Sequence, residues 1–301
     1  MSILDKKVVA VTGAANGLGR AYAVALAEAG AAVVCSDVDG AAVEQLAAEI
    51  TGGGGRALGR ADDVSAWPSG PALVEAAVQA FGRLDVLVNN AGIVRDRMMW
   101  NLSESDLDAV YGVHLRGTFT CGIATARHLR ERGSGGAIIN VTSAAHHGHP
   151  GQSNYAAMKG GIASLTYTWA MELARFGIRV NAISPMAWTG MTVTAARDEA
   201  AARAMAERLG PPERIAPLVV YLASDDADWI SGQVIGVSNE RISLGLHPRE
   251  SRQAFCAGGW TVDELRRRFR ATSGAMLEPC GSATQYPWSD GVRPQLAEPA
   301  G

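Results

Sequence analysis

The sequence predicts an α/β protein with a Rossmann-type, doubly wound fold: a mostly parallel sheet of seven strands with helices on both faces. Three observations lead to this prediction. Short apolar, β-branched runs alternate along the chain with alanine-rich segments of helical period. A glycine-rich turn joins the first apolar run to the first helical segment. The 301 residues are 48% hydrophobic, which is enough for one large core.

Each strand is predicted where a short apolar run ends at polar or glycine residues. The first run, Val8–Val11, is continuously apolar, as expected of a strand that is buried on both faces of a parallel sheet. The run at 84–89 has the same character, whereas 56–60 is the weakest of the set. In chain order, the predicted strands are 8–11, 32–37, 56–60, 84–89, 137–141, 178–183 and 233–237.

The helices are predicted between these strands, from segments with start and stop signals. The first helix ends at Gly30, a residue type that commonly terminates helices. Ser103 and Asp106 offer N-capping groups for a long helix that runs to Arg132. The predicted helices are 18–29, 40–50, 71–81, 103–132, 153–176 and 212–224.

The chain is predicted to form one main domain followed by an extension. Residues 1–240 make a nucleotide-binding domain, with a substrate flap near 185–210. The regular pattern fades from about Asn239, so 241–301 is predicted to be an extension with one helix at about 261–270. The Gly, Pro and Ser content after Ser273 predicts a tail without its own core, either disordered or packed on a neighbouring subunit.

The composition argues against several classes of function. A formal net charge of −3 gives no general attraction to nucleic acid. The four cysteines are widely spaced, so neither a disulfide framework nor a metal site is predicted. No stretch of about 18 residues is continuously apolar, and the first residues lack the apolar segment of a signal peptide. We therefore expect a cytoplasmic protein with no membrane span and no metal.

A dinucleotide site is predicted at the turn after the first strand. The segment 12–19 reads TGAANGLG and lies between a strand and a helix, the context in which a glycine motif is informative. Its glycines let the backbone approach a pyrophosphate, and the helix N-terminus adds free N–H groups and the positive end of a dipole. The residues expected to bind the cofactor here are Gly13, Asn16, Gly17, Leu18 and Gly19.

The end of the second strand indicates which dinucleotide is bound. Asp37 lies about 18 residues after Gly19, and a carboxylate there accepts hydrogen bonds from an adenosine ribose. The same charge repels a 2′-phosphate, because like charges at short range are unfavourable. The sequence therefore predicts NAD in preference to NADP.

Two further strand ends complete the predicted cleft. Asp63 and Val64 follow the third strand, where the adenine edge is expected. After the fourth strand the sequence reads NNAG, and its small residues let a nicotinamide ribose come close. Asparagine side chains there can also tie neighbouring strand ends together through backbone groups. The cofactor-binding residues expected after the fourth strand are Asn90, Ala91 and Gly92.

The chemistry is predicted at Tyr155 and Lys159. The two residues stand four positions apart in an apolar helix and therefore share one face. A phenol has a reference pKa of about 10, which a neighbouring ammonium lowers. Such a tyrosine can exchange a proton with a carbinol oxygen. Apart from Lys6 and Lys7, Lys159 is the sole lysine in the sequence, which indicates that this position needs an ammonium.

A YxxxK pattern alone also fits a core tyrosine beside a surface lysine, and the order of the motifs decides between the two. TGAANGLG, NNAG, YAAMK and NAISP occur in the order typical of short-chain dehydrogenases/reductases, and the sequence resembles that family from Lys6 to about Val237. The resemblance implies that a serine at the end of the fifth strand and Tyr155 bind the carbonyl oxygen. It also implies that Lys159 holds the nicotinamide ribose and lowers the pKa of Tyr155.

Two positions leave alternatives open within this resemblance. Counting along the fifth strand places Ser143 at the family's serine position, whereas counting thirteen residues back from Tyr155 reaches Thr142. Ser143 is preferred because a strand end is more rigid than a loop. His114 stands where many members have a proton-relay asparagine, and it is either a relay residue or a packed helix histidine.

The segments around Arg95, His114 and Pro185 resemble one branch of the family, which contains the dehydrogenase part of peroxisomal multifunctional enzyme type 2 and its bacterial relatives. That resemblance implies oxidation of a (3R)-hydroxyacyl-CoA or a 17β-hydroxysteroid. The bulky apolar side chains of the flap either contact a hydrophobic substrate body or pack on the fold. The residues expected to line the substrate site are His146, His149, Met186, Trp188 and Met191.

We therefore expect an NAD(H)-dependent oxidoreductase that interconverts a secondary alcohol and a ketone. A 3-oxoacyl thioester or small-ketone reductase is the alternative within this class. A non-catalytic NAD-binding regulatory module is the alternative outside it. The resemblance also implies a homodimer or homotetramer, formed through the helices that carry His114 and Tyr155.

Overall fold

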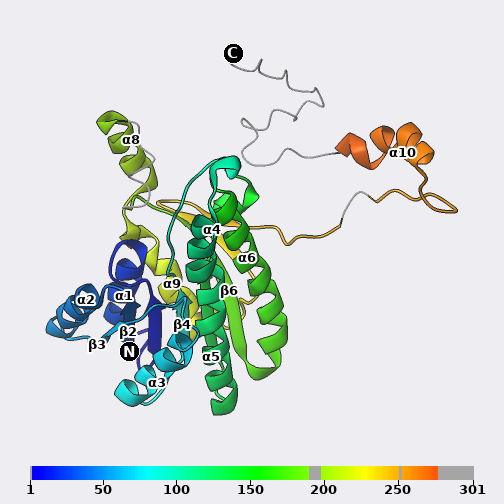
Figure 1. Cartoon of the computed structure of the whole chain (residues 1–301). Helices are drawn as coiled ribbons and strands as arrows, with labels where there is room; N and C mark the ends of the chain where they lie inside the picture. The colour runs from blue at the N-terminus through cyan, green and yellow to red at the C-terminus, as the bar shows by residue number, and fades with distance from the viewer. Residues whose placement is uncertain (1, 190–197, 251–252, 277–301) are drawn as a thin grey trace. The chain divides into compact units, whose positions relative to one another are not determined.

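The computed structural model of the chain describes residues 2–189, 198–250 and 253–276. They fall into two compact units, Met1–Gly245 and the segment from Leu246 onwards. The first unit holds the central sheet and the helices that cover it (Figure 1). None of the described helices is both long and apolar enough to cross a membrane. Met191, which was expected to line the substrate site, lies outside the described residues.

One eight-stranded sheet forms the centre of the first unit, in the order β3-β2-β1-β4-β5-β6-β7-β8. Strands β1 to β7 are parallel, and β8 pairs with β7 in the antiparallel sense. The strands are β1 (Val8–Thr12), β2 (Ala32–Asp37), β3 (Arg56–Ala61), β4 (Val86–Asn89), β5 (Gly136–Val141), β6 (Ile178–Met186), β7 (Val234–Ser238) and β8 (Ile242–Leu244).

The predicted fold class is confirmed, and the sheet has one strand more than the prediction. All seven expected parallel strands are present, with ends shifted by up to three residues. Strand β8 was missed because its three residues are all exposed. A segment that short and that exposed carries no apolar alternation from which a strand could be recognised.

Helices cover both faces of the sheet, as the doubly wound prediction requires. Side chains alternate along β1, so that Val9 and Val11 pack with α1, α2 and α9, whereas Val8 and Ala10 pack with α3, α5 and α6 (Figure 1). The helices are α1 (Gly17–Glu28), α2 (Gly40–Gly52), α3 (Ser69–Phe81), α4 (Glu104–Tyr111), α5 (Gly117–Arg132), α6 (Ser153–Leu173), α8 (Glu199–Leu209) and α9 (Ala216–Ala223).

The single long helix that was predicted over 103–132 is wrong in its middle. Ser103 and Asp106 form the expected capping box at its start. Between α4 and α5, however, Gly112–Arg116 forms a π-helical turn. Such turns insert an extra residue into a helix and frequently mark functional sites. Here the turn contains the buried His114.

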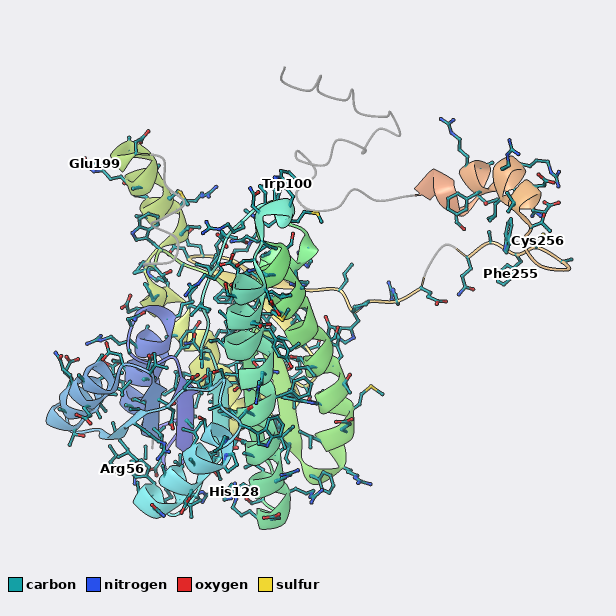
Figure 2. All side chains as sticks on the ribbon, viewed as in Figure 1. Arg56, Trp100, His128, Glu199, Phe255 and Cys256 are labelled. Atoms are coloured by element: carbon teal, nitrogen blue, oxygen red, sulfur yellow. The ribbon has the colours of Figure 1, made fainter. Side chains whose placement is uncertain are left out.

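The strand order has its switch point between β1 and β4. Strand β1 has β2 on one side and β4 on the other, so the chain winds away from β1 in both directions. Ligands of open parallel sheets bind at such a switch point, outside the carboxyl ends of the strands. In Figure 2, Trp100 and Glu199 lie at this end of the unit, and Arg56, which begins β3, lies at the other.

The second unit contains the helix that was expected near 261–270. Helix α10 spans Val262–Arg268 and is followed by a 3-10 turn. The Thr261 side chain accepts a hydrogen bond from the backbone N–H of Glu264 and so caps the helix (3.1 Å). The Arg268 guanidinium lies 5.1 Å from the centre of the Trp260 ring.

Candidate active site

The turn between β1 and α1 favours glycine at three positions. Gly13 and Gly17 have φ values of 66° and 54°, in the left-handed region that favours glycine. A Cβ on Gly19 would lie 2.0 Å from the Gly13 carbonyl oxygen. Asn16 makes no side-chain capping bond to α1. Leu18 packs on the core. The N-terminal N–H groups of α1 therefore face a compact, glycine-lined turn, which suits a pyrophosphate.

Asn90 ties the ends of β1 and β4 together, as expected. Its side-chain amide donates to the carbonyl oxygens of Thr12 (2.9 Å) and Gly13 (3.0 Å). The Thr12 hydroxyl accepts in return from the backbone N–H groups of Asn90 and Ala91, both at 3.1 Å. A Cβ on Gly13 would lie 2.7 Å from the Ala91 Cα. The floor of the predicted cleft is therefore rigid.

Asp37 lies at the end of β2, beside the glycine turn. Its two oxygens accept hydrogen bonds from the backbone N–H groups of Ala15 (3.0 Å) and Asp39 (3.2 Å). A carboxylate has about four lone-pair positions, so both oxygens can still accept from a ribose. The carboxylate is half-buried at the position where the adenosine ribose was expected.

The structure separates the two aspartates that follow β3. Asp62 accepts hydrogen bonds from Arg60 Nε (2.7 Å) and from the Ser36 hydroxyl (3.2 Å), so it belongs to the scaffold. Asp63 is exposed and accepts from the backbone N–H of Ser65 (2.9 Å). Val64 is buried. This arrangement suits the expected role of Asp63 at an adenine edge.

Ser143 and Tyr155 come together at the carboxyl end of β5. Ser143 follows β5 directly, and Tyr155 lies in the first turn of α6. Burial raises the pKa of Tyr155 above its usual value of 10, and the neighbouring Ser143 side chain has a smaller, lowering effect on that pKa. The neighbouring Thr142 hydroxyl instead donates to the backbone carbonyl of Lys159 (2.7 Å).

Lys159 is buried beside Tyr155. Its Nζ donates to the carbonyl oxygen of Val141 (2.6 Å) and lies 5.5 Å from the centre of the Tyr155 ring. Burial lowers the pKa of Lys159 from 10.5 to about 7. The lowering of the Tyr155 pKa by Lys159 stays a prediction. The Lys159 ammonium donates to the carbonyl oxygen of Val141, and burial has the largest effect on the pKa of Tyr155.

His114 packs against Tyr155. The two rings meet edge to face, with their centres 5.2 Å apart. The histidine is 1% exposed, and its Nε2 contacts the carbonyl oxygen of Ile93 at 2.7 Å. Burial, with a smaller effect from the Lys159 charge, lowers the pKa of His114 to about 3. The π-helical turn thus brings His114 into the site.

Asn154 is a site residue that the sequence reasoning missed. It is 2% exposed, its amide donates to the carbonyl oxygen of Arg95 (3.1 Å), and its Oδ1 accepts from the backbone N–H of Tyr155 (2.8 Å). A β-bridge between Arg97 and Gln152 reinforces the same junction. Asn154 therefore fastens the segment after β4 to the helix that carries Tyr155. An asparagine directly before the tyrosine was the signal that could have revealed it.

His146 and His149, which were expected at the substrate mouth, follow Ser143 closely in the sequence. The His146 Nδ1 makes a short hydrogen bond to the Ser143 carbonyl, and its ring stacks on His147, with the two centres 4.1 Å apart. His149 is exposed in the next loop. Among the described residues, no group of three His, Cys, Asp or Glu side chains could hold a metal ion.

Of the residues that were expected to line the substrate site from the flap, Met186 is the last residue of β6 and Trp188 follows it two positions later. Met186 is exposed and Trp188 is half-buried. The Trp188 backbone N–H donates to the carbonyl of Gly210, directly after α8 (2.8 Å). Helix α8 was not predicted; the contact anchors the described start of the flap on the residue that follows this helix.

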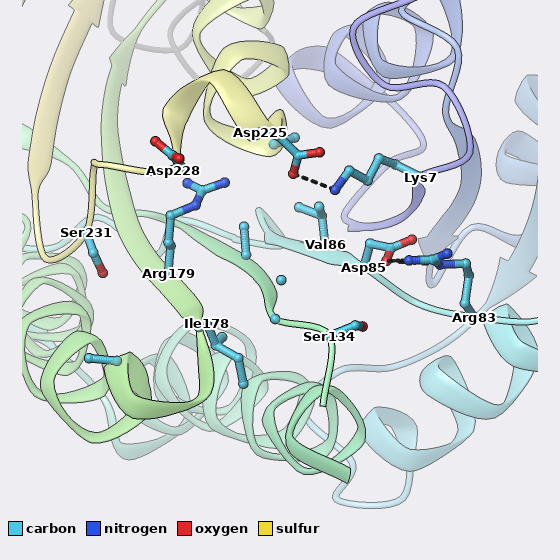
Figure 3. Close-up of a pocket in the computed structure, with 16 residues that line it drawn as sticks. Lys7, Arg83, Asp85, Val86, Ser134, Ile178, Arg179, Asp225, Asp228 and Ser231 are labelled. Carbon is cyan, nitrogen blue, oxygen red and sulfur yellow. Dashed lines mark hydrogen bonds and ion pairs between the residues drawn. The ribbon is translucent and has the colours of Figure 1, made fainter. Parts of the chain in front are cut away.

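A cavity of about 450 Å³ lies at the opposite edge of the sheet, beneath the amino ends of the strands (Figure 3). Its wall carries the ion pairs Lys7–Asp225 and Arg83–Asp85, each 2.6 Å long. None of the residues expected to do the chemistry lines it. The candidate active site is therefore the crevice at the carboxyl ends, not this cavity.

Comparison with known proteins agrees with this geometry. The family described as Enoyl-(Acyl carrier protein) reductase matches residues 13–239. The chain is 40% identical over 239 residues to the 3-oxoacyl-[acyl-carrier-protein] reductase FabG of Thermotoga maritima, covering 78% of this chain and 97% of that protein. A solved short chain dehydrogenase from Mycobacterium avium superposes with a TM-score of 0.82 at 37% identity, covering 93% of this chain and 98% of the other. The chain belongs to the short-chain dehydrogenase/reductase family.

Two further relatives confirm the branch that the sequence resembles. The chain is 39% identical over 284 residues to the hydroxyacyl-CoA dehydrogenase ChsB1 of Mycobacterium tuberculosis, covering 89% of this chain and 88% of that protein. It is 40% identical over 237 residues to the peroxisomal multifunctional enzyme type 2 of Mus musculus, covering 76% of this chain and 31% of that longer protein. As a short-chain dehydrogenase/reductase, the chain is an oxidoreductase of CH–OH groups from a family that binds nicotinamide cofactors.

Proposed function

We propose that this enzyme interconverts a secondary alcohol and a ketone with NAD(H), and that Ser143, Tyr155 and Lys159 are its catalytic residues. The observation that carries the proposal is the placement of Tyr155 beside Ser143 and the buried Lys159, whose Nζ lies 5.5 Å from the centre of the tyrosine ring. A regulatory module that only binds a dinucleotide has no need of this buried set. Its presence therefore favours the enzyme over the non-catalytic alternative.

The three side chains divide the work at the substrate oxygen. A bound nicotinamide dinucleotide supplies or accepts the hydride, and its oxidised ring adds a positive charge to the site. Tyr155 takes the hydroxyl proton during oxidation and returns it during reduction. Ser143 holds the same oxygen in place through a hydrogen bond. Lys159 binds the ribose, and its protonated form stabilises the Tyr155 phenolate.

Ser143 is the better candidate of the two adjacent hydroxyls. The Thr142 hydroxyl is 1% exposed and is engaged by the Lys159 carbonyl. Ser143 is half-buried, and its side chain lies close enough to Tyr155 to lower the pKa of the phenol. A substrate oxygen that meets Tyr155 therefore also meets Ser143.

The preference for NAD rests on Asp37. Its carboxylate lies beside the glycine turn, and two backbone N–H groups hold it there. This position suits hydrogen bonds to a 2′-hydroxyl and disfavours a 2′-phosphate. The segment 36–40, Ser-Asp-Val-Asp-Gly, also contains no basic side chain that could pair with a 2′-phosphate.

For the substrate, a (3R)-hydroxyacyl-CoA comes first and a 17β-hydroxysteroid second. A relative that aligns over most of the chain is named a hydroxyacyl-CoA dehydrogenase. Met186 and Trp188 supply apolar surface at the start of the flap, and His146 and His149 add polar groups near Ser143. A 3-oxoacyl thioester reductase is the second candidate, because the Thermotoga relative is named for that activity.

A spectrophotometric screen of the full-length protein tests this proposal. NAD⁺ reduction is followed with (3R)- and (3S)-hydroxyacyl-CoAs, 17β-hydroxysteroids and small secondary alcohols, and each is repeated with NADP⁺. We expect the highest kcat/KM with a (3R)-hydroxyacyl-CoA and NAD⁺. A clear preference for NADPH-driven reduction of a 3-oxoacyl thioester would support the second candidate. If no alcohol and no ketone is turned over, the result would contradict the enzyme and support the non-catalytic regulatory module.

We also propose a homodimer or homotetramer that uses the outer surface of α5 and α6. The two helices border a hollow of about 270 Å³ lined by Trp169, Arg130 and Phe176. Met171 on α6 is 83% exposed. Light scattering after gel filtration should give two or four times the chain mass at micromolar concentration, and Met171→Lys should shift it towards the monomer. A monomeric wild type would contradict this.

A further inference from the structure

We propose that His114 is a positioning residue for Tyr155, and that Gly92 supplies the space that its ring requires. The inference rests on the proposed function in one respect, namely that Tyr155 exchanges the proton with the substrate. It concerns how that phenol is held.

The His114 ring is anchored to the segment that follows β4. Its Nε2 lies 2.7 Å from the carbonyl oxygen of Ile93 and 3.0 Å from the backbone nitrogen of the same residue. A ring nitrogen of a neutral imidazole carries either a hydrogen or a lone pair, so it satisfies one of these two partners at a time. In either tautomer the ring is bound to Ile93 and cannot turn away without losing that bond.

The anchored ring forms one wall for Tyr155. The rings of His114 and Tyr155 are nearly perpendicular, at 88°, with their centres 5.2 Å apart. This is the edge-to-face arrangement that aromatic pairs prefer. Lys159 Nζ lies 5.5 Å from the centre of the same Tyr155 ring. The phenol is thus held by contacts from the π-helical turn as well as from its own helix.

Gly92 is shaped to this histidine. A Cβ on Gly92 would lie 2.5 Å from Cε1, 3.2 Å from Nδ1 and 3.3 Å from Nε2 of His114, and these are its three nearest atoms. Gly92 is not among the glycines with positive φ. Its backbone therefore permits other residues, and the need for glycine comes from the imidazole ring. The room at Gly92 that was expected to serve a ribose is thus also taken up by His114.

The contacts of His114 do not suit a proton carrier. Nε2 meets only the backbone of Ile93, and Nδ1 is buried with no hydrogen-bond partner among the described residues. A proton accepted on Nδ1 would have to leave through Nε2, and Nε2 contacts only a peptide group. The low pKa of about 3, caused mainly by burial, keeps the ring uncharged near neutral pH. Positioning is the role that agrees with all of these contacts.

Kinetics of His114→Ala and His114→Phe test the role, with NADH-driven reduction of acetoacetyl-CoA as the assay. Small misplacements of a reacting group cost up to about a hundredfold in rate, so we expect His114→Ala to lower kcat roughly 10- to 100-fold with KM nearly unchanged. His114→Phe keeps an aromatic edge against Tyr155 and should recover part of this loss. The solvent isotope effect should not change, and added buffer should not restore the rate. A larger solvent isotope effect with rescue by buffer acids would show a relay and overturn the proposal, as would full activity of His114→Ala.

A thermal cycle on the ligand-free protein tests the packing without any assay of activity. Gly92→Ala should lower Tm by roughly 5 °C in the wild-type background, as expected of an overpacked site. In the His114→Ala background the same change should lower Tm much less, because the ring that it strikes is gone. Equal losses in both backgrounds would contradict the proposal. If the wild type turns over no substrate but the cycle shows coupling, the proposed function fails while the packing argument stands.

Discussion

Thr142 and Lys159 are joined by a hydrogen bond of 2.7 Å, from the threonine hydroxyl to the backbone carbonyl oxygen of the lysine. The next residue, Ser143, interacts through its hydroxyl with the side chain of Tyr155. Two adjacent hydroxyls at the end of β5 therefore serve different purposes. One holds α6 against the sheet, and the other faces the group that exchanges a proton.

This division predicts opposite effects of two neighbouring substitutions. Ser143→Ala should lower kcat by about 100- to 1000-fold, the usual loss when a donor to a reacting oxygen is removed, and should leave Tm nearly unchanged. Thr142→Val should keep kcat within about tenfold but reduce the free energy of unfolding by about 1 kcal/mol, because a buried hydrogen bond is lost. Steady-state kinetics and thermal melts of both variants decide the point. The reverse pattern would assign the chemistry to Thr142.

Lys159 predicts a pH-dependent stability. Its pKa is 10.5 when exposed and about 7 in the folded protein. Between these values the unfolded chain binds one proton more, so the free energy of unfolding rises with pH by up to about 1.4 kcal/mol per unit across this window. Below pH 7 both states are protonated and the contribution to the slope vanishes.

Denaturant unfolding of the ligand-free protein at several pH values from 7 to 10 measures this slope. Lys159→Met removes the titrating group, so its stability should depend less on pH than that of the wild type. The difference between the two proteins should shift in favour of the wild type as the pH rises. Parallel curves for the two proteins would show that Lys159 is not destabilised by its burial.

Asp37 predicts the cofactor preference. Asp37→Asn removes the charge that opposes a 2′-phosphate, so the ratio of kcat/KM with NADP to that with NAD should rise roughly tenfold. Asp39→Asn is the matched control, because this substitution removes an equal charge nearby. The Asp39 side chain caps α2 by accepting from the backbone N–H of Ala42. The control should leave the ratio within about twofold. An equal shift in both variants would mean that general charge, rather than contact at Asp37, sets the preference.

The sequence predicted most of the scaffold, because the carboxyl ends of parallel strands meet at one edge of a sheet. Each candidate group after β1, β2, β4 and β5 was therefore expected in the same crevice, as the sheet order confirms. Helical spacing predicted that Tyr155 and Lys159 share one face, and the order of the motifs indicated that this face carries the chemistry. Strand β8 was not predicted, because its three exposed residues show no alternation of apolar and polar side chains along the strand.

Other parts of the site depend on tertiary packing, which a local pattern does not carry. The π-helical turn that brings His114 inward interrupts what the sequence presents as one continuous helix. The role of Asn154 depends on a segment about 60 positions earlier, where it binds the carbonyl of Arg95. The raised pKa of Tyr155 results from burial, and burial is known only once the neighbouring elements are in place.

Tyr155→Phe tests the central claim most directly, through turnover and NADH binding measured on the same preparation. The variant loses the phenol oxygen but keeps the ring that packs against His114. We predict that turnover falls by at least about a thousandfold, while the Kd for NADH, measured by fluorescence titration, stays within a few-fold of the wild type. Turnover within tenfold of the wild type would contradict the account.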